Sequence, residues 1–87
     1  MSEVKFVLRT ADQTRKAEIA LARSAVGADV IQAAVQNWAM PLDTDYTLVN
    51  TATGKSILPM QALAEGIVED GHILEVQPVL VAGVGYR

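Results

Sequence analysis

Residues 45–78, DYTLVNTATGKSILPMQALAEGIVEDGHILEVQP, carry the pattern that decides the fold. In DYTLVN, apolar and polar residues alternate, which predicts a short strand with Tyr46 and Leu48 on one face. TATGK predicts a turn in which Gly54 adopts a positive φ angle. SIL, residues 56–58, then predicts a second and very short strand.

The second half of this stretch predicts a helical turn followed by the last strand. PMQALAEG predicts about one turn of helix that begins at Pro59 and ends near Gly66. The DG dipeptide at residues 70–71 predicts a tight turn. HILEVQPVLV alternates again, which predicts a strand with Leu74 directed inward. Because Pro78 has no N–H to donate, we expect the chain to leave the sheet after it.

The N-terminal half predicts a hairpin followed by a helix. EVKFVLRT, residues 3–10, and KAEIALAR, residues 16–23, each alternate, and a short polar turn joins them, as in an antiparallel pair. In GADVIQAAVQNWAMP, residues 27–41, the apolar residues recur at helical spacing, which predicts an amphipathic helix of about three turns. Asp29 suits the positive end of the helix dipole, and Pro41 prevents continuation.

The order of these elements predicts an α+β domain. One helix packs across one face of a mixed sheet of four to five strands, and the first and last strands pair in parallel at its centre. We expect residues 1–78 to form the domain and residues 79–87 to form a C-terminal tail. We refer to residues 79–87 as the tail below.

Composition narrows the possible functions. The 87 residues include no cysteine, which excludes a disulfide framework, a thiolate zinc site and a cysteine nucleophile. The net charge of −3 argues against nucleic acid and anionic membranes as partners. The N-terminal ten residues contain no apolar stretch typical of a signal peptide or a transmembrane span, so we expect a cytoplasmic protein.

The element order resembles the β-grasp fold of ubiquitin and its relatives over nearly the whole chain. Within residues 46–78 it is also similar to the small bacterial ubiquitin-like proteins associated with type VII secretion. Those proteins share a strand ending in VN, a polar turn and an L…GI…DG..LEV pattern. The corresponding positions here are Val49, Asn50, Leu63, Gly66, Ile67, Asp70, Gly71, Leu74, Glu75 and Val76. The resemblance is specific for the fold and less so for the function.

The tail resembles a different group of relatives. Secretion-associated proteins tend to stop soon after the last strand, whereas this chain continues through VLVAGVGYR. In this it looks like ubiquitin-like modifiers, and like precursors of bacterial modifiers encoded beside activating, conjugating and JAMM-type peptidase proteins. It departs from ubiquitin in having the separated glycines Gly83 and Gly85 in place of two adjacent ones, and in lacking basic residues before them.

The resemblance assigns roles to residues 81–87 of the tail. Removal of Tyr86 and Arg87 would leave Gly85 as the mature C-terminus, and cleavage after Gly83 is the alternative. Conjugation requires a carbonyl that enters a narrow channel, and glycine suits this because it has no Cβ to block attack. The expected partner-binding part of the tail is formed by Val81, Ala82 and Val84.

The expected function is therefore that of a protein modifier and not of an enzyme. The resemblance implies three kinds of partner, an adenylating activating enzyme, a conjugating enzyme and a JAMM-type peptidase, together with target proteins. It implies no cofactor bound to this chain. Two alternatives stay open: a ubiquitin-like binding module that is never conjugated, such as a secretion accessory, and a self-assembling unit that forms a homo-oligomer through the apolar tail.

Outside the tail, the sequence offers one candidate surface. Val7, Ala20 and Val49 are expected on the sheet face away from the helix, where ubiquitin-like proteins usually receive partners. Single exposed apolar residues are also common on ordinary surfaces. Trp38 is expected to anchor the end of the helix in the core, with a surface role as the alternative.

The remaining chemically active residues do not predict a site. His72 is the only histidine and is expected to be solvated or lightly hydrogen-bonded. The carboxylate pairs Asp43–Asp45 and Glu69–Asp70 are expected to be solvated loop charges, because no histidine flanks either pair in its predicted loop. No metal site is expected.

Overall fold

The computed structural model describes residues 2–41 and 44–79, which form five strands and one helix. Their bounds are β1 Glu3–Thr10, β2 Lys16–Ala22, α1 Gly27–Trp38, β3 Tyr46–Asn50, β4 Lys55–Ile57 and β5 Ile73–Pro78. All predicted strands and the long helix are present in the predicted order. The shortest strand begins one residue earlier than predicted, and Leu58, assigned to it from the sequence, lies outside it with 59% of its surface exposed.

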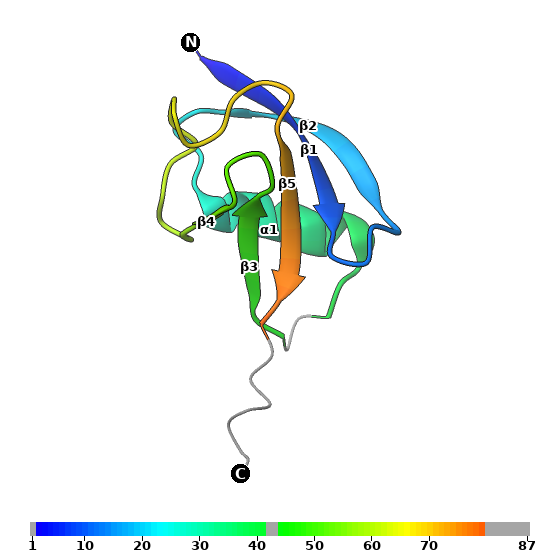
Figure 1. Ribbon diagram of the computed structural model, residues 1–87. Helices are drawn as coiled ribbons and strands as arrows, with labels where there is room; N and C mark the ends of the chain where they lie inside the picture. The colour runs from blue at the N-terminus through cyan, green and yellow to red at the C-terminus, as the bar shows by residue number, and fades with distance from the viewer. Residues whose placement is uncertain (1, 42–43, 80–87) are drawn as a thin grey trace.

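The five strands form one mixed sheet in the order β2-β1-β5-β3-β4 (Figure 1). β1 and β5 are parallel neighbours near the centre of the sheet, as predicted for the first and last strands. All other pairs are antiparallel. The parallel pairing means that β5 ends on the same side of the molecule as the hairpin that follows β1.

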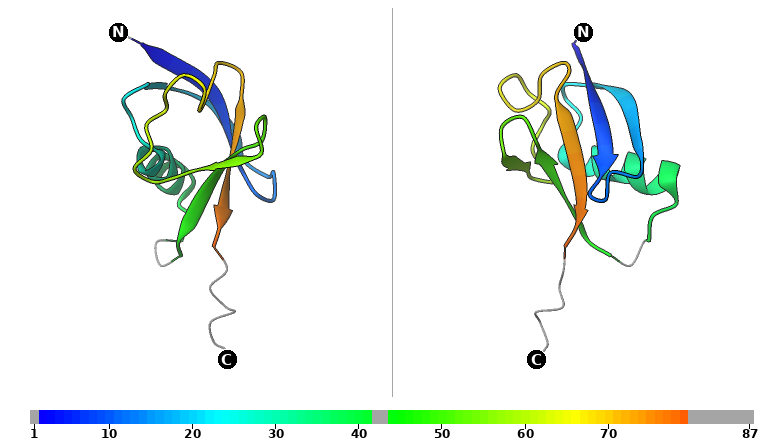
Figure 2. Two further views of the ribbon diagram at one scale, coloured as in Figure 1. Left: turned by 60° about the vertical axis from the view of Figure 1, so that its left-hand side comes forward. Right: turned by 45° about the vertical axis from the view of Figure 1, so that its right-hand side comes forward.

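The helix α1 crosses one face of this sheet, and the core lies between them (Figure 2). Alternation along the strands places every second side chain in this layer, so that Val4, Phe6 and Leu8 are almost completely buried. The other core residues are Val30, Ala34, Leu48, Ile57, Leu63, Val68, Leu74 and Val76. This arrangement is the ubiquitin-like β-grasp predicted from the sequence.

Local signals set the bounds of α1. The Asp29 carboxylate accepts a hydrogen bond from the Val26 N–H at 3.0 Å, which caps the first turn. At the other end Ala39 adopts a left-handed conformation with φ 50°, and the Met40 N–H donates to the Val35 carbonyl at 3.1 Å. Among the described residues, no helix combines the length and the apolar character needed to cross a membrane.

The helical turn predicted over residues 59–66 is wrong. The structure has two separate turns there, closed by the Gln61 N–H on the Leu58 carbonyl and by the Ile67 and Val68 N–H groups on the Ala64 carbonyl. Between the turns, Ala62 forms an isolated bridge with Val26. Backbone bonds to residues 25–28, at and just before the start of α1, therefore replace the local bonds of a helix.

Candidate functional site

The residues predicted to act in conjugation lie outside the described part of the chain. They are the processing residues Gly83, Gly85, Tyr86 and Arg87 and the partner-binding residues Val81, Ala82 and Val84. The structure describes the first residue of the tail, Val79, which is 39% exposed. Val79 therefore marks the place where the tail joins the described domain.

The tail begins at the edge of the domain. Pro78 pairs with Tyr46, and the Val79 N–H donates to the Asp45 carbonyl at 2.8 Å. β5 thus ends at Pro78, as predicted, and one further backbone bond joins Val79 to the residue before β3. β5 ends at the side of the molecule opposite to the start of β1, so the chain reaches the tail without crossing the core (Figure 1).

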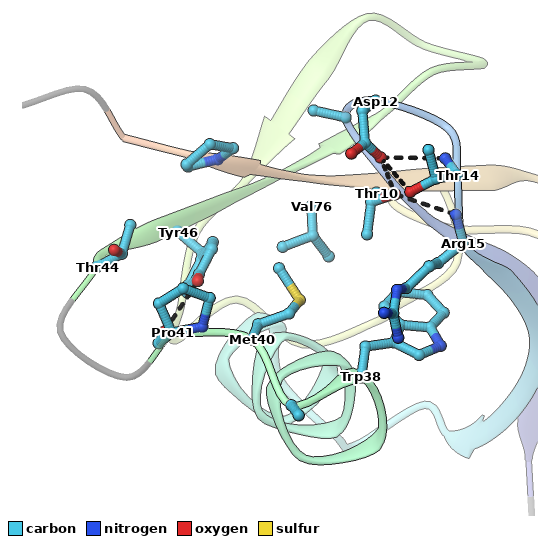
Figure 3. A pocket seen from close by; sticks show the side chains of 13 residues that line it. Thr10, Asp12, Thr14, Arg15, Trp38, Met40, Pro41, Thr44, Tyr46 and Val76 are labelled. Carbon is cyan, nitrogen blue, oxygen red and sulfur yellow. Dashed lines mark hydrogen bonds between the residues drawn. The ribbon is translucent and has the colours of Figure 1, made fainter.

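A pocket of about 470 Å³ lies beside the start of the tail (Figure 3). It is formed by the end of α1, the hairpin between β1 and β2, and the ends of β3 and β5. Trp38, Met40 and Val76 give it an apolar lining, and Pro78 belongs to its wall. Its volume lies within the range of roughly 300–1,000 Å³ typical of ligand pockets.

Trp38 packs against the core, as predicted, and also lines this pocket. Its side chain is half-buried and packs against the core, as expected of an anchor at the end of the helix. It also faces the pocket, where Figure 3 shows it at the same end as Arg15. No local sequence pattern predicts the pocket, because its lining comes from separate segments of the chain.

The hairpin at the rim of this pocket holds a carboxylate in its ionised form. The Asp12 carboxylate accepts hydrogen bonds from the Thr10 hydroxyl at 2.6 Å, the Thr14 hydroxyl at 2.8 Å and the Thr14 N–H at 3.0 Å. These bonds, with that of Thr10 foremost, lower the pKa of Asp12 to about 2. Asp12 is thus negatively charged at neutral pH.

The three residues of the predicted patch share the outer sheet face but do not occupy adjoining positions. In the register of the sheet, Val7 lies between Glu18 and Ile73. Ala20, on the edge strand β2, pairs with Lys5. Val49 lies between Glu75 and Ser56. Val7 therefore adjoins the apolar Ile73, whereas the direct neighbours of Ala20 and Val49 are charged or polar.

An ion pair occupies the middle of the outer face. Arg9 Nε lies 2.9 Å from Glu75 Oε2, and these side chains are only 24% and 12% exposed. The Gln77 amide donates to the other Glu75 oxygen at 2.6 Å. The bond from Gln77, followed by the contact with Arg9, lowers the pKa of Glu75. The face is therefore polar at the position of Arg9 and Glu75 on its two central strands.

His72 and the carboxylates beside it are more closely bound than the sequence predicted. His72 Nδ1 accepts the Glu69 N–H at 3.1 Å and lies 3.0 Å from the Asn50 amide nitrogen. The Asp70 carboxylate accepts the Lys5 N–H at 2.9 Å. These groups therefore also make structural hydrogen bonds, while Asp70 is exposed, as predicted for a loop charge, and the Glu69 side chain is 45% exposed.

Glu69 is held by the loop itself. Its carboxylate accepts the Gly66 N–H at 2.7 Å and a hydrogen bond from Arg23 at 3.1 Å. The Gly66 bond, and then the positive charge of Arg23, lower the pKa of Glu69. Of the other predicted pair, Asp45 is exposed and Asp43 lies outside the described residues. No cluster of three metal-ligating side chains occurs in the described ranges.

Comparisons with known proteins support the fold and leave the family open. No protein family and no curated protein matches the sequence. Among solved structures, a ubiquitin of Caldiarchaeum subterraneum is similar with a TM-score of 0.74 and 20% identity, covering 94% of this chain and 100% of that one. The ubiquitin-like domain of Plasmodium falciparum Dsk2 has a TM-score of 0.70 and 10% identity, with 90% and 100% covered.

A third structure extends the comparison to a domain of a larger protein. The C-terminal ubiquitin-like domain of mouse tubulin-specific chaperone e has a TM-score of 0.64 and 18% identity, covering 88% of this chain and 87% of that one. Identities this low carry information about the fold alone. The chain has a ubiquitin-like β-grasp fold.

Proposed function

We propose that the chain is a bacterial ubiquitin-like protein modifier, trimmed after Gly85, adenylated by an activating enzyme and conjugated to target proteins. The observation that carries this proposal is the combination of a ubiquitin-like fold with a tail of small and apolar residues that starts at the outer end of β5. A secretion accessory that stops after its last strand does not need this extension.

Each step of the proposed conjugation acts on the C-terminal residues of the chain. A JAMM-type peptidase adds water across the Gly85–Tyr86 peptide bond and releases the dipeptide Tyr86–Arg87. The new Gly85 carboxylate attacks the α-phosphorus of ATP, which forms an acyl-adenylate and expels pyrophosphate. A thiol or hydroxyl of an enzyme then displaces AMP, and an acceptor group on the target finally displaces that enzyme.

The proposal is tested with an adenylating activating enzyme of the kind that it requires. Exchange of labelled pyrophosphate into ATP reports adenylation directly. We expect exchange with a chain that ends at Gly85, and none with the chain that ends at Arg87. A chain that ends at Gly83 serves as the matched control for the site of trimming. The proposal fails if no trimmed chain supports exchange.

A non-conjugated binding module is the second candidate. It is favoured by the outer sheet face, where Val7 and Val49 are half-buried and no described element covers them. Deletion of residues 82–87 separates the two functions, because a binding module keeps its activity without them and a modifier does not. For the self-assembling unit, the test is light scattering over a concentration series, where a constant monomer mass excludes it.

A further inference from the structure

β2 is an edge strand whose outer side pairs with no other described strand. It pairs with β1 alone and lies at one end of the strand order (Figure 2). Its seven residues form a continuous ladder with β1 and include no proline, whereas β4 at the opposite edge has only three residues. A long and regular edge of this kind presents free backbone groups to another strand.

The free backbone groups belong to the even-numbered residues of β2. The Thr10 N–H donates to the Arg15 carbonyl at 3.0 Å, so the odd-numbered residues that continue this ladder bond to β1. Because the bonding direction alternates along an antiparallel strand, the even-numbered residues direct their N–H and C=O groups away from β1. The Ala22 carbonyl accepts the Ala25 N–H at 2.9 Å, and for the other groups the described chain provides no partner. These residues are Lys16, Glu18, Ala20 and Ala22.

The same even-numbered side chains lie on the outer face of the sheet in an asymmetric pattern. The first half of β2 carries Lys16 and Glu18 there, and the second half carries two alanines. Each alanine has a charged neighbour on β1. These pairs are Ala20 with Lys5 and Ala22 with Glu3. All four charged side chains are exposed, and within the described residues none of them forms an ion pair.

We propose that two copies of this chain pair through β2, antiparallel and about a twofold axis at Ile19, to form one continuous sheet. In this register Glu18 lies opposite the partner's Ala20. The partner's Lys5 is one strand further, so its Cα lies about 9–10 Å from that of Glu18. Because Ala20 is small, the long lysine and glutamate side chains meet above it as an ion pair.

The same register pairs the second set of charges. Lys16 lies opposite the partner's Ala22, and the partner's Glu3 is the next residue beyond it. The twofold axis repeats both contacts. Exposed ion pairs contribute little free energy each, so they select the register, while backbone hydrogen bonds drive the association. Ile19, which is half-buried on the helix side, lies against its own copy at the axis.

Neighbouring registers place like charges together. A shift of two residues in one direction puts Glu18 opposite the partner's Glu18. A shift in the other direction puts Glu18 opposite the partner's Ala22, with Glu3 beyond it. Like charges in these positions are unfavourable. The strand is therefore complementary to its own copy in one register, which favours a second copy over an unrelated peptide as the occupant.

Sedimentation equilibrium of the full chain, from about 10 μM to about 1 mM, measures the dimer, because an interface built on one strand pair is small and weak. Amide hydrogen exchange followed by NMR locates it. Where about nine-tenths of the chains are paired, exchange at Glu18 and Ala20 should be about tenfold slower than in dilute protein. The Ile19 amide already faces β1 and should change little.

Charge reversal tests the register. Glu18→Lys faces the partner's Lys5 and should raise the dissociation constant about tenfold. The double variant Lys5→Glu/Glu18→Lys should restore dimers, and Glu65→Lys, an exposed residue outside the strands, is the matched control. Ala20→Pro removes an N–H that β1 does not use, so it should abolish dimers without unfolding the chain. Circular dichroism checks the fold of each variant.

The outcomes separate this dimer from its alternatives. A chain that stays monomeric at the highest concentration overturns the proposal and leaves the edge for a strand of another protein. Dimers without slowed exchange at Glu18 and Ala20 also overturn it, because assembly then uses another surface, such as the tail. Dimers that Glu18→Lys leaves unchanged overturn the register. Loss with Glu18→Lys and recovery in the double variant support it. Neither the tail nor conjugation enters this proposal, so it stands or falls separately from the proposed function.

Discussion

At the scale of single residues, Asn50 is the polar side chain on which the sheet and its loops most depend. It is completely buried at the end of β3. Its amide nitrogen donates to the Ile67 carbonyl at 2.9 Å and lies 3.0 Å from His72 Nδ1, and its amide oxygen accepts the Ala52 N–H at 2.9 Å. One side chain therefore joins the β3–β4 turn to the loop that precedes β5.

Replacing Asn50 by alanine should lower the free energy of unfolding by about 2–3 kcal/mol, because the Ile67 carbonyl and the Ala52 N–H lose their buried partner. Urea denaturation measures the change. Asn37→Ala is the matched control, since Asn37 is exposed and bonds only to the Ala33 carbonyl within α1. The proposed role of Asn50 is wrong if both variants lose the same free energy of unfolding.

The Asp12 carboxylate should make stability depend on acid pH. Its pKa in the folded protein is about 2, below its ordinary value of 3.8, so the unfolded chain binds the proton more readily. The stabilisation is present above pH 4 and is lost as the pH falls toward 2. Thermal denaturation from pH 5 to pH 2 should show this loss, and Asp12→Asn should reduce its slope. If the pH dependence of stability is the same in Asp12→Asn, Asp12 is not its source.

At the scale of elements, the strands and α1 could be predicted because each is specified by a local period. Tyr46 and Leu48 face the core side as their alternation predicts, and Val30 and Ala34 are buried on the predicted helix face. The segment over residues 59–66 could not be predicted in this way. Its backbone groups bond to residues 25–28, far away in sequence, and Pro59 and Gly66 are compatible with turns as well as with a helix.

Gly27 shows how this distant contact constrains α1. A Cβ at this position would lie 2.5 Å from the Leu58 carbonyl oxygen, and the Gly27 N–H donates to the Gln61 carbonyl at 3.0 Å. The sequence could not reveal the contact, because glycine at the start of a helix is common. Only the approach of the loop after β4 requires the absence of a side chain here.

Gly27→Ala should therefore destabilise the protein by about 1–3 kcal/mol, although alanine has the higher helix propensity. The clash is with backbone, which cannot move without disturbing the loop. Thermal denaturation followed by circular dichroism measures the effect, and Gln36→Ala on the exposed side of α1 is the control. A stabilised Gly27→Ala variant would show that the close approach does not occur.

Arg23, directly after β2, also binds the loop between β4 and β5. Its guanidinium donates to the Val68 carbonyl at 2.9 Å, to the Leu63 carbonyl at 3.2 Å and to Glu69 at 3.1 Å. Arg23→Lys should cost about 1–2 kcal/mol, because an ammonium group cannot reproduce this fork of donors. Amide hydrogen exchange should become faster at residues 64–69 and stay unchanged in α1. Uniformly faster exchange would indicate a global effect instead.

At the scale of the whole molecule, the sequence was sufficient for the topology and insufficient for the site. The parallel pairing of β1 with β5 followed from the order of elements and the right-handed crossover. The pocket at Trp38 and the ion pair between Arg9 and Glu75 depend on which strands become neighbours, and no local pattern encodes this. The tail residues remain predictions, because they lie outside the described chain.

The central claim is that this ubiquitin-like domain carries a C-terminus that is trimmed and then activated. The most direct measurement is the intact mass of the chain after incubation with a JAMM-type peptidase that processes ubiquitin-like precursors. We predict a single product that lacks Tyr86 and Arg87 and ends at Gly85. A chain that retains both residues under conditions where the peptidase is active would contradict the claim.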